Sequence, residues 1–147
     1  MPIKLDVQVA STNADIPEDA QFQLWADSFQ LSVETSACLR IVDESEVKTL
    51  NLKYRQIDKA TNVLSFPAEV PSQVNIKFLG DIVICAPVVV SEAKEQTKNI
   101  NDHWAHLLIH GLLHLQGYDH IEENDANKME SLEVEILKSL KIGNPYE

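Results

Sequence analysis

Three histidines in the last third of the chain have the spacing of a metal site. His110 and His114 stand four residues apart, so both side chains project from one face of a helix. Gly117 can end that helix with a left-handed backbone, and the chain can then bring His120 back as a third ligand. Three protein ligands leave a fourth position open, which is typical of catalytic zinc. The alternative is that these are ordinary histidines on a helix surface.

The pattern matches the extended zinc-protease frame H-E-x-x-H-x-x-G-x-x-H at every position but one. Gly111 stands where the frame has the glutamate that acts as general base. Its absence leaves metal binding intact but removes the usual machinery for peptide hydrolysis. The pattern therefore predicts a one-zinc hydrolase that cleaves phosphodiesters, because a metal can activate water and polarise a phosphoryl oxygen.

Phosphodiester cleavage also needs a cation near the charge that develops on the phosphate, and arginine suits that role. The chain has two arginines, Arg40 and Arg55. Arg40 lies in an apolar segment that reads as a strand. Arg55 ends a predicted helix in the only basic third of the chain, although an arginine there can also be a solvated helix cap.

The elements that must position these residues follow from hydrophobic periodicity. Alternation predicts strands, and spacing of three to four residues predicts helices, in the order β-α-β-α-β-β-α-α-α. We expect strands at 3–9, 37–42, 62–66 and 79–86, and helices at 15–31, 45–55, 87–96, 101–116 and 122–140. A loop is expected over 68–77. The fold class is α+β, with a small mixed four-stranded sheet covered by about five helices and a metalloprotease-like histidine helix. A three-layer α/β sandwich is an equal description.

Composition fits one soluble domain over residues 1–147. The formal net charge of −11 argues against coating nucleic acid by bulk electrostatics. The charge is uneven, with a net of −7 over residues 1–46, +2 over 47–98 and −6 over 99–147. No long apolar run or secretory signal occurs, so we expect a cytoplasmic protein with no membrane partner. The four glycines do not form a phosphate-binding glycine loop.

Three blocks of sequence resemble the YbeY family, whose members are bacterial single-strand-specific endoribonucleases. They are YRQIDKATNVLSFP at 54–67, LGDIVI at 79–84 and HGLLHLQGYDH at 110–120. Ala60 stands where many members have proline. The resemblance implies one zinc ion on His110, His114 and His120, with Arg55 and His114 serving catalysis. It also implies a role in 3′-end maturation of 16S ribosomal RNA and late ribosome quality control. The implied partners are single-stranded ribosomal RNA, the small ribosomal subunit and its proteins.

Several neighbouring residues have two interpretations. Asp119 could orient a ligand or form the turn, and Asp81 is favoured as a structural residue near the sheet edge. His106 is one turn before His110 and is favoured as a partly buried helix residue. Tyr118 is expected to pack under the turn. Asn62, Ser65 and Phe66 could line a cleft for an extended RNA strand.

Two rival functions remain open on the sequence. One is a zinc peptidase with a displaced base, which Gly111 disfavours. The other is a non-catalytic ribosome assembly factor with structural zinc, whose acidic surface docks on basic ribosomal proteins. The attacking group in the expected reaction is either water or the RNA 2′-hydroxyl.

Overall fold

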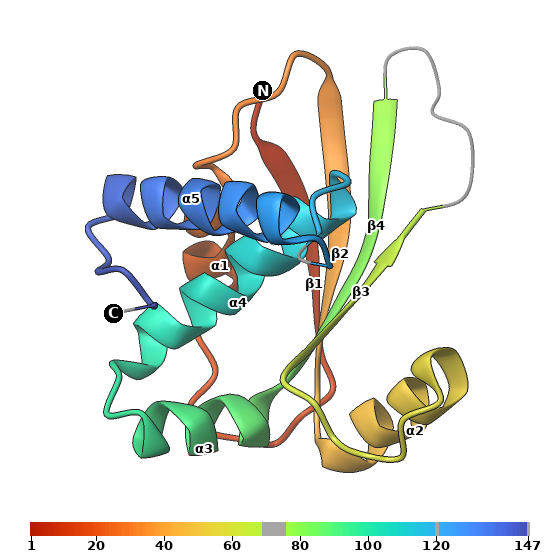
Figure 1. Cartoon of the computed structure of the whole chain (residues 1–147). Coiled ribbons are helices and arrows are strands. Elements are labelled where there is room, and N and C mark those ends of the chain that lie inside the picture. Colours follow the sequence, from red (N-terminus) through yellow and green to blue (C-terminus); the bar gives the residue numbers. More distant parts are fainter. Residues whose placement is uncertain (69–75, 120, 147) are drawn as a thin grey trace.

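The computed structural model describes residues 1–68, 76–119 and 121–146 of the chain. Its strands and helices follow the predicted order (Figure 1). The strands are β1 (Ile3–Val9), β2 (Glu34–Val42), β3 (Val63–Pro67) and β4 (Ile76–Cys85). The helices are α1 (Asp19–Ala26), α2 (Glu44–Arg55), α3 (Ala86–Glu95), α4 (Ile100–Leu115) and α5 (Glu123–Ser139). The predicted α+β class, with a four-stranded sheet and five helices, is confirmed.

The sheet is mixed, and its strand order is β1-β2-β4-β3. Strand β1 pairs parallel with β2, and β2 pairs parallel with β4, while β3 pairs antiparallel with β4. Strand β3 is therefore an edge strand. Figure 1 shows α1, α4 and α5 on one side of the sheet and α2 on the other, near one end. The free edge of β3 consequently lies where elements from both sides of the sheet can reach it.

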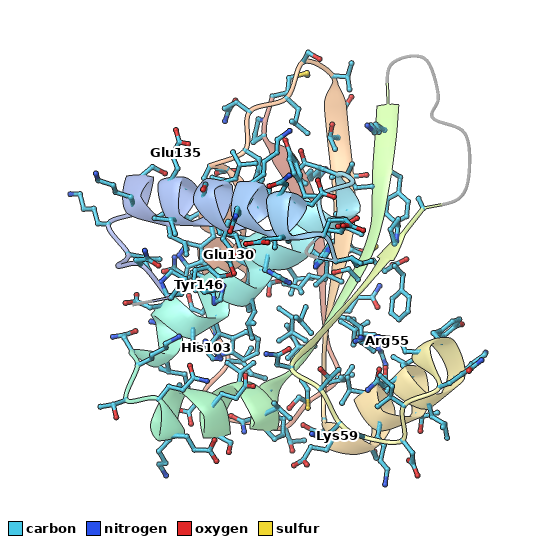
Figure 2. All side chains as sticks on the ribbon, in the orientation of Figure 1. Arg55, Lys59, His103, Glu130, Glu135 and Tyr146 are labelled. Atoms are coloured by element: carbon cyan, nitrogen blue, oxygen red, sulfur yellow. The ribbon has the colours of Figure 1, made fainter. Side chains whose placement is uncertain are left out.

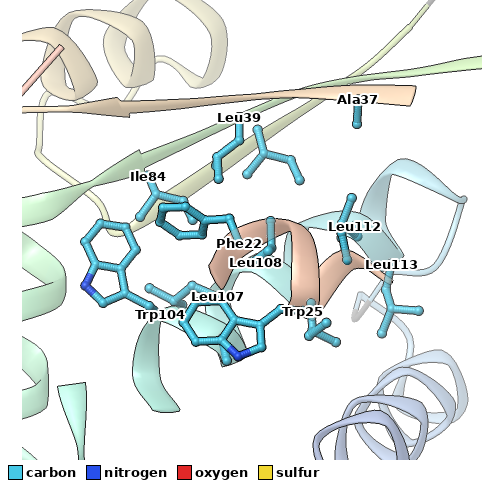
Figure 3. Close-up of a cluster of buried hydrophobic side chains, with 14 of the residues drawn as sticks. Phe22, Trp25, Ala37, Leu39, Ile84, Trp104, Leu107, Leu108, Leu112 and Leu113 are labelled. Atoms are coloured by element: carbon cyan, nitrogen blue, oxygen red, sulfur yellow. The ribbon is translucent and has the colours of Figure 1, made fainter. Parts of the chain in front are cut away.

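The main core lies between the sheet and helices α1 and α4. Alternate strand residues such as Leu39 and Ile84 are fully buried there against Phe22 and Trp104 (Figure 3). The Trp104 and Phe22 rings meet edge to face with centroids 5.7 Å apart, and the Trp104 indole N–H donates to the Asp15 carbonyl at 3.1 Å. This packing fixes the rotation of α4 about its axis, and so decides which of its residues face away from the core.

A smaller core packs α2 against the other face of the sheet. Val47 of α2 is fully buried against Leu64, Val83 and Cys85. The acidic first turn of α2 favours the positive end of the helix dipole, and Arg55 lies in its last turn, where a cation is favoured. Helix α2 thus holds Arg55 at a defined place beside β3.

Some element ends differ from the predicted ones. Helix α1 ends at Ala26 rather than near residue 31, because the Ser28 hydroxyl and the Phe29 N–H bond back to Trp25 and Ala26 carbonyls and tighten the chain into a turn. Strand β4 already begins at Ile76, and most of the predicted 68–77 loop, residues 69–75, lies outside the described residues. Helix α4 begins at Ile100, one residue before the predicted start, and Asn99 caps it by accepting from two backbone N–H groups.

None of the helices in the described part of the chain is long and apolar enough to cross a membrane.

The predicted end of α4 is confirmed, because Gly117 follows it with a φ of +99°.

The pairing of β4 with β2 is irregular near Gly80, where β3 lies close on the other side of β4. The register between β2 and β4 shifts between Ser36 and Cys38, so that β4 has one extra residue there. Gly80 lies at this point, opposite Pro67, with a φ of +137°. A Cβ atom on Gly80 would lie 2.2 Å from the Phe66 carbonyl oxygen. The close approach of β3 to β4 therefore requires glycine at position 80.

Replacing Gly80 by alanine should strongly destabilise the protein. The added methyl group would clash with the β3 backbone, and its φ is unfavourable for alanine, so we expect a loss of at least about 2 kcal/mol in the free energy of unfolding. Gly143→Ala is the matched control, because nothing lies within 4 Å of its Cβ position. Urea unfolding of the three proteins measures the difference. Equal stability of both variants would contradict the proposed close approach.

Candidate active site

Helix α4 is buried on all sides except along one stripe. Asp102, His106, His110 and His114 recur every fourth residue, and each is only partly buried, whereas most other residues of the helix are buried. The spacing places these four side chains on one face. The sequence prediction that His110 and His114 share a helix face is therefore confirmed by the geometry.

The imidazole rings of His110 and His114 converge on one point. Their Nε2 atoms lie 3.0 Å apart, and their ring centroids are 4.5 Å apart. Two nitrogen ligands of a tetrahedral zinc ion, each about 2.0–2.1 Å from the metal, would be about 3.3 Å apart. The two nitrogens are thus close to the separation that a shared metal ion requires.

Hydrogen bonds to the far sides of the two rings set their tautomers. The His110 Nδ1 lies 2.5 Å from a Glu133 carboxylate oxygen, and the His114 Nδ1 lies 2.9 Å from the Tyr118 backbone carbonyl. Both partners only accept, so each Nδ1 carries the hydrogen. In the neutral rings both Nε2 atoms then present lone pairs toward each other, an arrangement that a cation between them stabilises. The residues therefore fit a bound divalent metal.

Glu133 of α5 is the centre of this network. Its side chain is fully buried, and its carboxylate accepts hydrogen bonds from His106 at 3.1 Å, from His110, and from the Tyr146 hydroxyl. Burial alone would raise the pKa of the Glu133 carboxyl, but these hydrogen bonds outweigh it and lower the pKa to about 2. Burial and the carboxylate beside it raise the pKa of Tyr146 above its ordinary range. Glu133 is therefore an ionised acceptor that holds the ring of His110.

His106, His110 and Glu133 form a second group whose donor atoms lie close enough together to hold a cation. In this group the short contacts are hydrogen bonds from the histidines to a carboxylate that is 0% exposed. His106 also does not line the cleft that His110 and His114 reach. These contacts favour a supporting role for His106 and Glu133, behind a site formed by the two Nε2 atoms.

A cleft of about 540 Å³ opens in front of His110 and His114. Strand β3 and the end of α2 form its other walls, and Arg55 extends from α2 toward it (Figure 2). The residues that line it are Tyr54, Arg55, Thr61, Asn62, Val63, Leu64, Ser65, Phe66, Pro67, His110 and His114. The structure therefore brings Arg55 and two of the three predicted histidines to one cleft. His120 lies outside the described residues, and its place as third ligand stays a prediction.

The two arginines have different surroundings. Arg40 makes a two-pronged ion pair with Glu46, with N–O distances of 2.6 and 3.0 Å. For Arg55 the structure gives no salt bridge to another described residue, and its side chain is exposed at the cleft. Of the two arginines, Arg55 is thus the one whose side chain is available to an anionic ligand at the cleft.

The structure shows the contacts of the neighbouring residues. Asp119 accepts from the backbone N–H of Ile121 at 3.2 Å, a contact typical of a turn, and its relation to His120 lies outside the described residues. Tyr118 packs against the main core under that turn. Asp81 lies beside Cys38 in a different cleft, which the histidines do not line. His106 is partly buried by Glu133 and Tyr146, as expected of a helix residue.

Sequence analysis missed Glu133 and Tyr146. Glu133 lies four residues from the buried Met129 and four from the buried Leu137, so an acidic residue interrupts the apolar stripe of α5. That interruption is a readable signal of a buried, partnered carboxylate. Tyr146 gives no comparable signal, because it follows α5 in a segment without periodicity.

Gly111 faces the sheet rather than the cleft. A Cβ atom at this position would lie 3.0 Å from a side-chain carbon of Ile82, which is fully buried in β4. A glutamate at position 111 would therefore be forced into the core. The absence of the zinc-protease carboxylate follows from how α4 packs on this sheet, so position 111 offers no place for a general base.

Comparison with known proteins gives two findings. A family model described as "Endoribonuclease YbeY" matches residues 6–141 of this chain. The fold is also similar to the solution structure of TM1509 from Thermotoga maritima, with a TM-score of 0.59. That similarity covers 95% of this chain and 91% of the other at 21% sequence identity, so it supports the fold.

The lowered pKa of Glu133 predicts a specific acid sensitivity. A carboxyl whose pKa is about 2 when folded, against 4.5 as its ordinary value, contributes stability above pH 4.5 that is lost as the pH falls toward 2. Glu133→Gln should lose about 1–3 kcal/mol of unfolding free energy at neutral pH, because the amide cannot accept from all three donors. The variant should then lose less stability than the wild type between pH 4.5 and 2.

Urea unfolding across this pH range measures the effect, with Glu135→Gln as the control. Glu135 is exposed on the same helix, so its replacement should change little. If Glu133→Gln and Glu135→Gln have the same pH dependence, Glu133 is not the ionised centre of the network.

Proposed function

Because this chain belongs to the YbeY endoribonuclease family, we propose that it is a zinc-dependent endoribonuclease that cuts single-stranded RNA in the cleft between α2, β3 and α4. The observation that carries the proposal is the pair of Nε2 atoms, 3.0 Å apart on His110 and His114, in the cleft that Arg55 also lines. A set of imidazole donors with one cation beside it suits phosphodiester chemistry better than peptide chemistry.

The proposed ligands of one zinc ion are His110, His114 and His120. When bound, the metal supplies a Lewis acid that polarises the phosphate and activates the attacking oxygen. The chain fixes the ligands through their other nitrogens. Glu133 orients His110, and the Tyr118 carbonyl orients His114, so neither ring needs to reorganise when a metal binds.

Arg55 has the role of stabilising negative charge on the phosphate. Its guanidinium presents a fork of N–H donors that matches two phosphate oxygens. Its position in the last turn of α2, at the mouth of the cleft, supports contact with the scissile phosphate.

The wider role that we propose is maturation of the 3′ end of 16S ribosomal RNA and late ribosome quality control, in the cytoplasm. The small ribosomal subunit and its proteins are the proposed partners. The net charge of −11 supports docking on basic ribosomal proteins, because such a surface attracts them and repels free RNA. The same charge favours the second candidate, an assembly factor without catalysis.

Metal content and RNA cleavage measured on the same samples test these roles. The wild type should hold about one zinc ion per chain and cut single-stranded RNA. His114→Ala should lose both properties. Arg55→Ala should keep the metal and lose cleavage by about 10²- to 10³-fold, because one charge-stabilising donor is removed. His106→Gln should keep most of the metal, since its side chain does not line the cleft.

Three outcomes would contradict the proposal. Equal RNA cleavage by all variants indicates a contaminating nuclease and favours the assembly factor. Loss of zinc in His106→Gln together with retention in His114→Ala favours the group around Glu133 as the metal site. Cleavage of unstructured peptides by the wild type, lost in His114→Ala, favours the zinc peptidase.

A further inference from the structure

A pair of aromatic rings, one of them exposed, lines the cleft that the histidines reach. Tyr54 of α2 is 57% exposed, and Phe66 of β3 is half-buried. Their ring centroids lie 5.1 Å apart with an angle of 63° between the ring planes. In such an edge-to-face pair, one ring offers only its edge to the other, so its faces are not used by the pair. Phe66 packs partly against the smaller core, whereas Tyr54 gives the cleft an exposed aromatic ring.

The surroundings of this aromatic pair are basic, although the protein as a whole is acidic. Lys53 and Arg55 flank Tyr54 in the last turn of α2. The Lys53 ammonium group lies 5.2 Å from the Tyr54 ring centroid, and Arg55 lies between α2 and β3 (Figure 2). Aromatic rings interleaved with cations are the combination with which proteins hold single-stranded nucleic acid, since bases stack on the rings and phosphates meet the charges.

We propose that Tyr54 and Phe66 form a stacking site for one unpaired base of the RNA strand. The proposal rests on the proposed function and assigns a substrate contact to it. A phosphate held by Arg55 in front of the two histidines places the adjoining nucleotide at the same cleft as the Tyr54 ring, because Arg55, the histidines and Tyr54 line one cleft. The base then lies on the ring while the backbone passes Arg55.

This site accounts for selection of single strands without selection of sequence. A base stacks on a ring through its flat face, which every base has, so stacking discriminates weakly among bases. A base that is paired and stacked within a duplex cannot offer that face to a protein side chain. Stacking at this site also attracts RNA locally, whereas the net charge of −11 repels RNA at a distance.

Binding of a cleavage-resistant oligonucleotide tests the site separately from catalysis. The probe is a fluorescein-labelled 2′-O-methyl oligouridine of about ten nucleotides, long enough to span a single-strand site. Fluorescence anisotropy gives its affinity for the wild type and the variants. Tyr54→Ala should weaken binding about 5- to 150-fold, the equivalent of the ~1–3 kcal/mol that one stacked base contributes.

Two variants serve as controls. Tyr54→Phe keeps the ring and should stay within about twofold of the wild type, because stacking needs no hydroxyl. Leu52→Ala removes another exposed apolar side chain, 49% exposed on the same helix but outside the cleft, and should also leave binding unchanged. Thermal unfolding of each variant establishes that it is folded.

The possible failures are distinguishable. If the wild type cuts single-stranded RNA but Tyr54→Ala binds the probe as well as the wild type does, the stacking site is overturned and the proposed function stands. If Tyr54→Phe loses as much affinity as Tyr54→Ala, or Leu52→Ala does, stacking on the Tyr54 ring is likewise overturned. If the wild type neither binds the probe nor cuts RNA, the proposed function itself fails.

Discussion

The Glu133 carboxylate is fully buried, and a buried charge persists only where several donors hydrogen-bond it. His106, His110 and Tyr146 meet that requirement from α4 and from the segment after α5. The same contacts turn the Nε2 of His110 toward His114, at a separation close to what a shared metal needs. The hydrogen bonds to this one buried carboxylate thus join three parts of the protein: helix α5, the segment that follows it, and the histidine face of α4.

The cleft forms where two helices that pack on opposite faces of the sheet both reach strand β3. Helix α4 packs on one face of the sheet, and α2 packs on the other through a separate, smaller core. Both reach the cleft beside β3, because β3 is the edge strand and leaves its side open. Gly80 keeps β3 close to β4 at this edge. The histidines and Arg55 therefore approach each other only when both cores are complete.

The protein as a whole is acidic, whereas the charged residues at its cleft are basic. A net charge of −11 repels RNA at a distance, while Arg55 and Lys53 provide cations at the cleft. Long-range repulsion lowers the rate of unguided encounters, and close contacts determine the affinity once an RNA strand is in place. Under the proposed function, attraction between the acidic surface and basic ribosomal proteins would offset this repulsion of the RNA.

The sequence by itself determined the order of the elements, the α+β class and the helix face shared by His110 and His114, because these depend on local periodicity. It also determined the left-handed end of α4 at Gly117, because that end depends on the backbone freedom of one residue. Element ends were less predictable, since hydrogen bonds such as those at Ser28 shortened α1. Only the tertiary structure decided that Arg40 pairs with Glu46 while Arg55 faces the cleft. It alone also joined His110 to Glu133, 23 residues away, and Tyr54 to Phe66 across two elements. Contacts between distant segments depend on how helices pack on the sheet, and no local pattern encodes that packing.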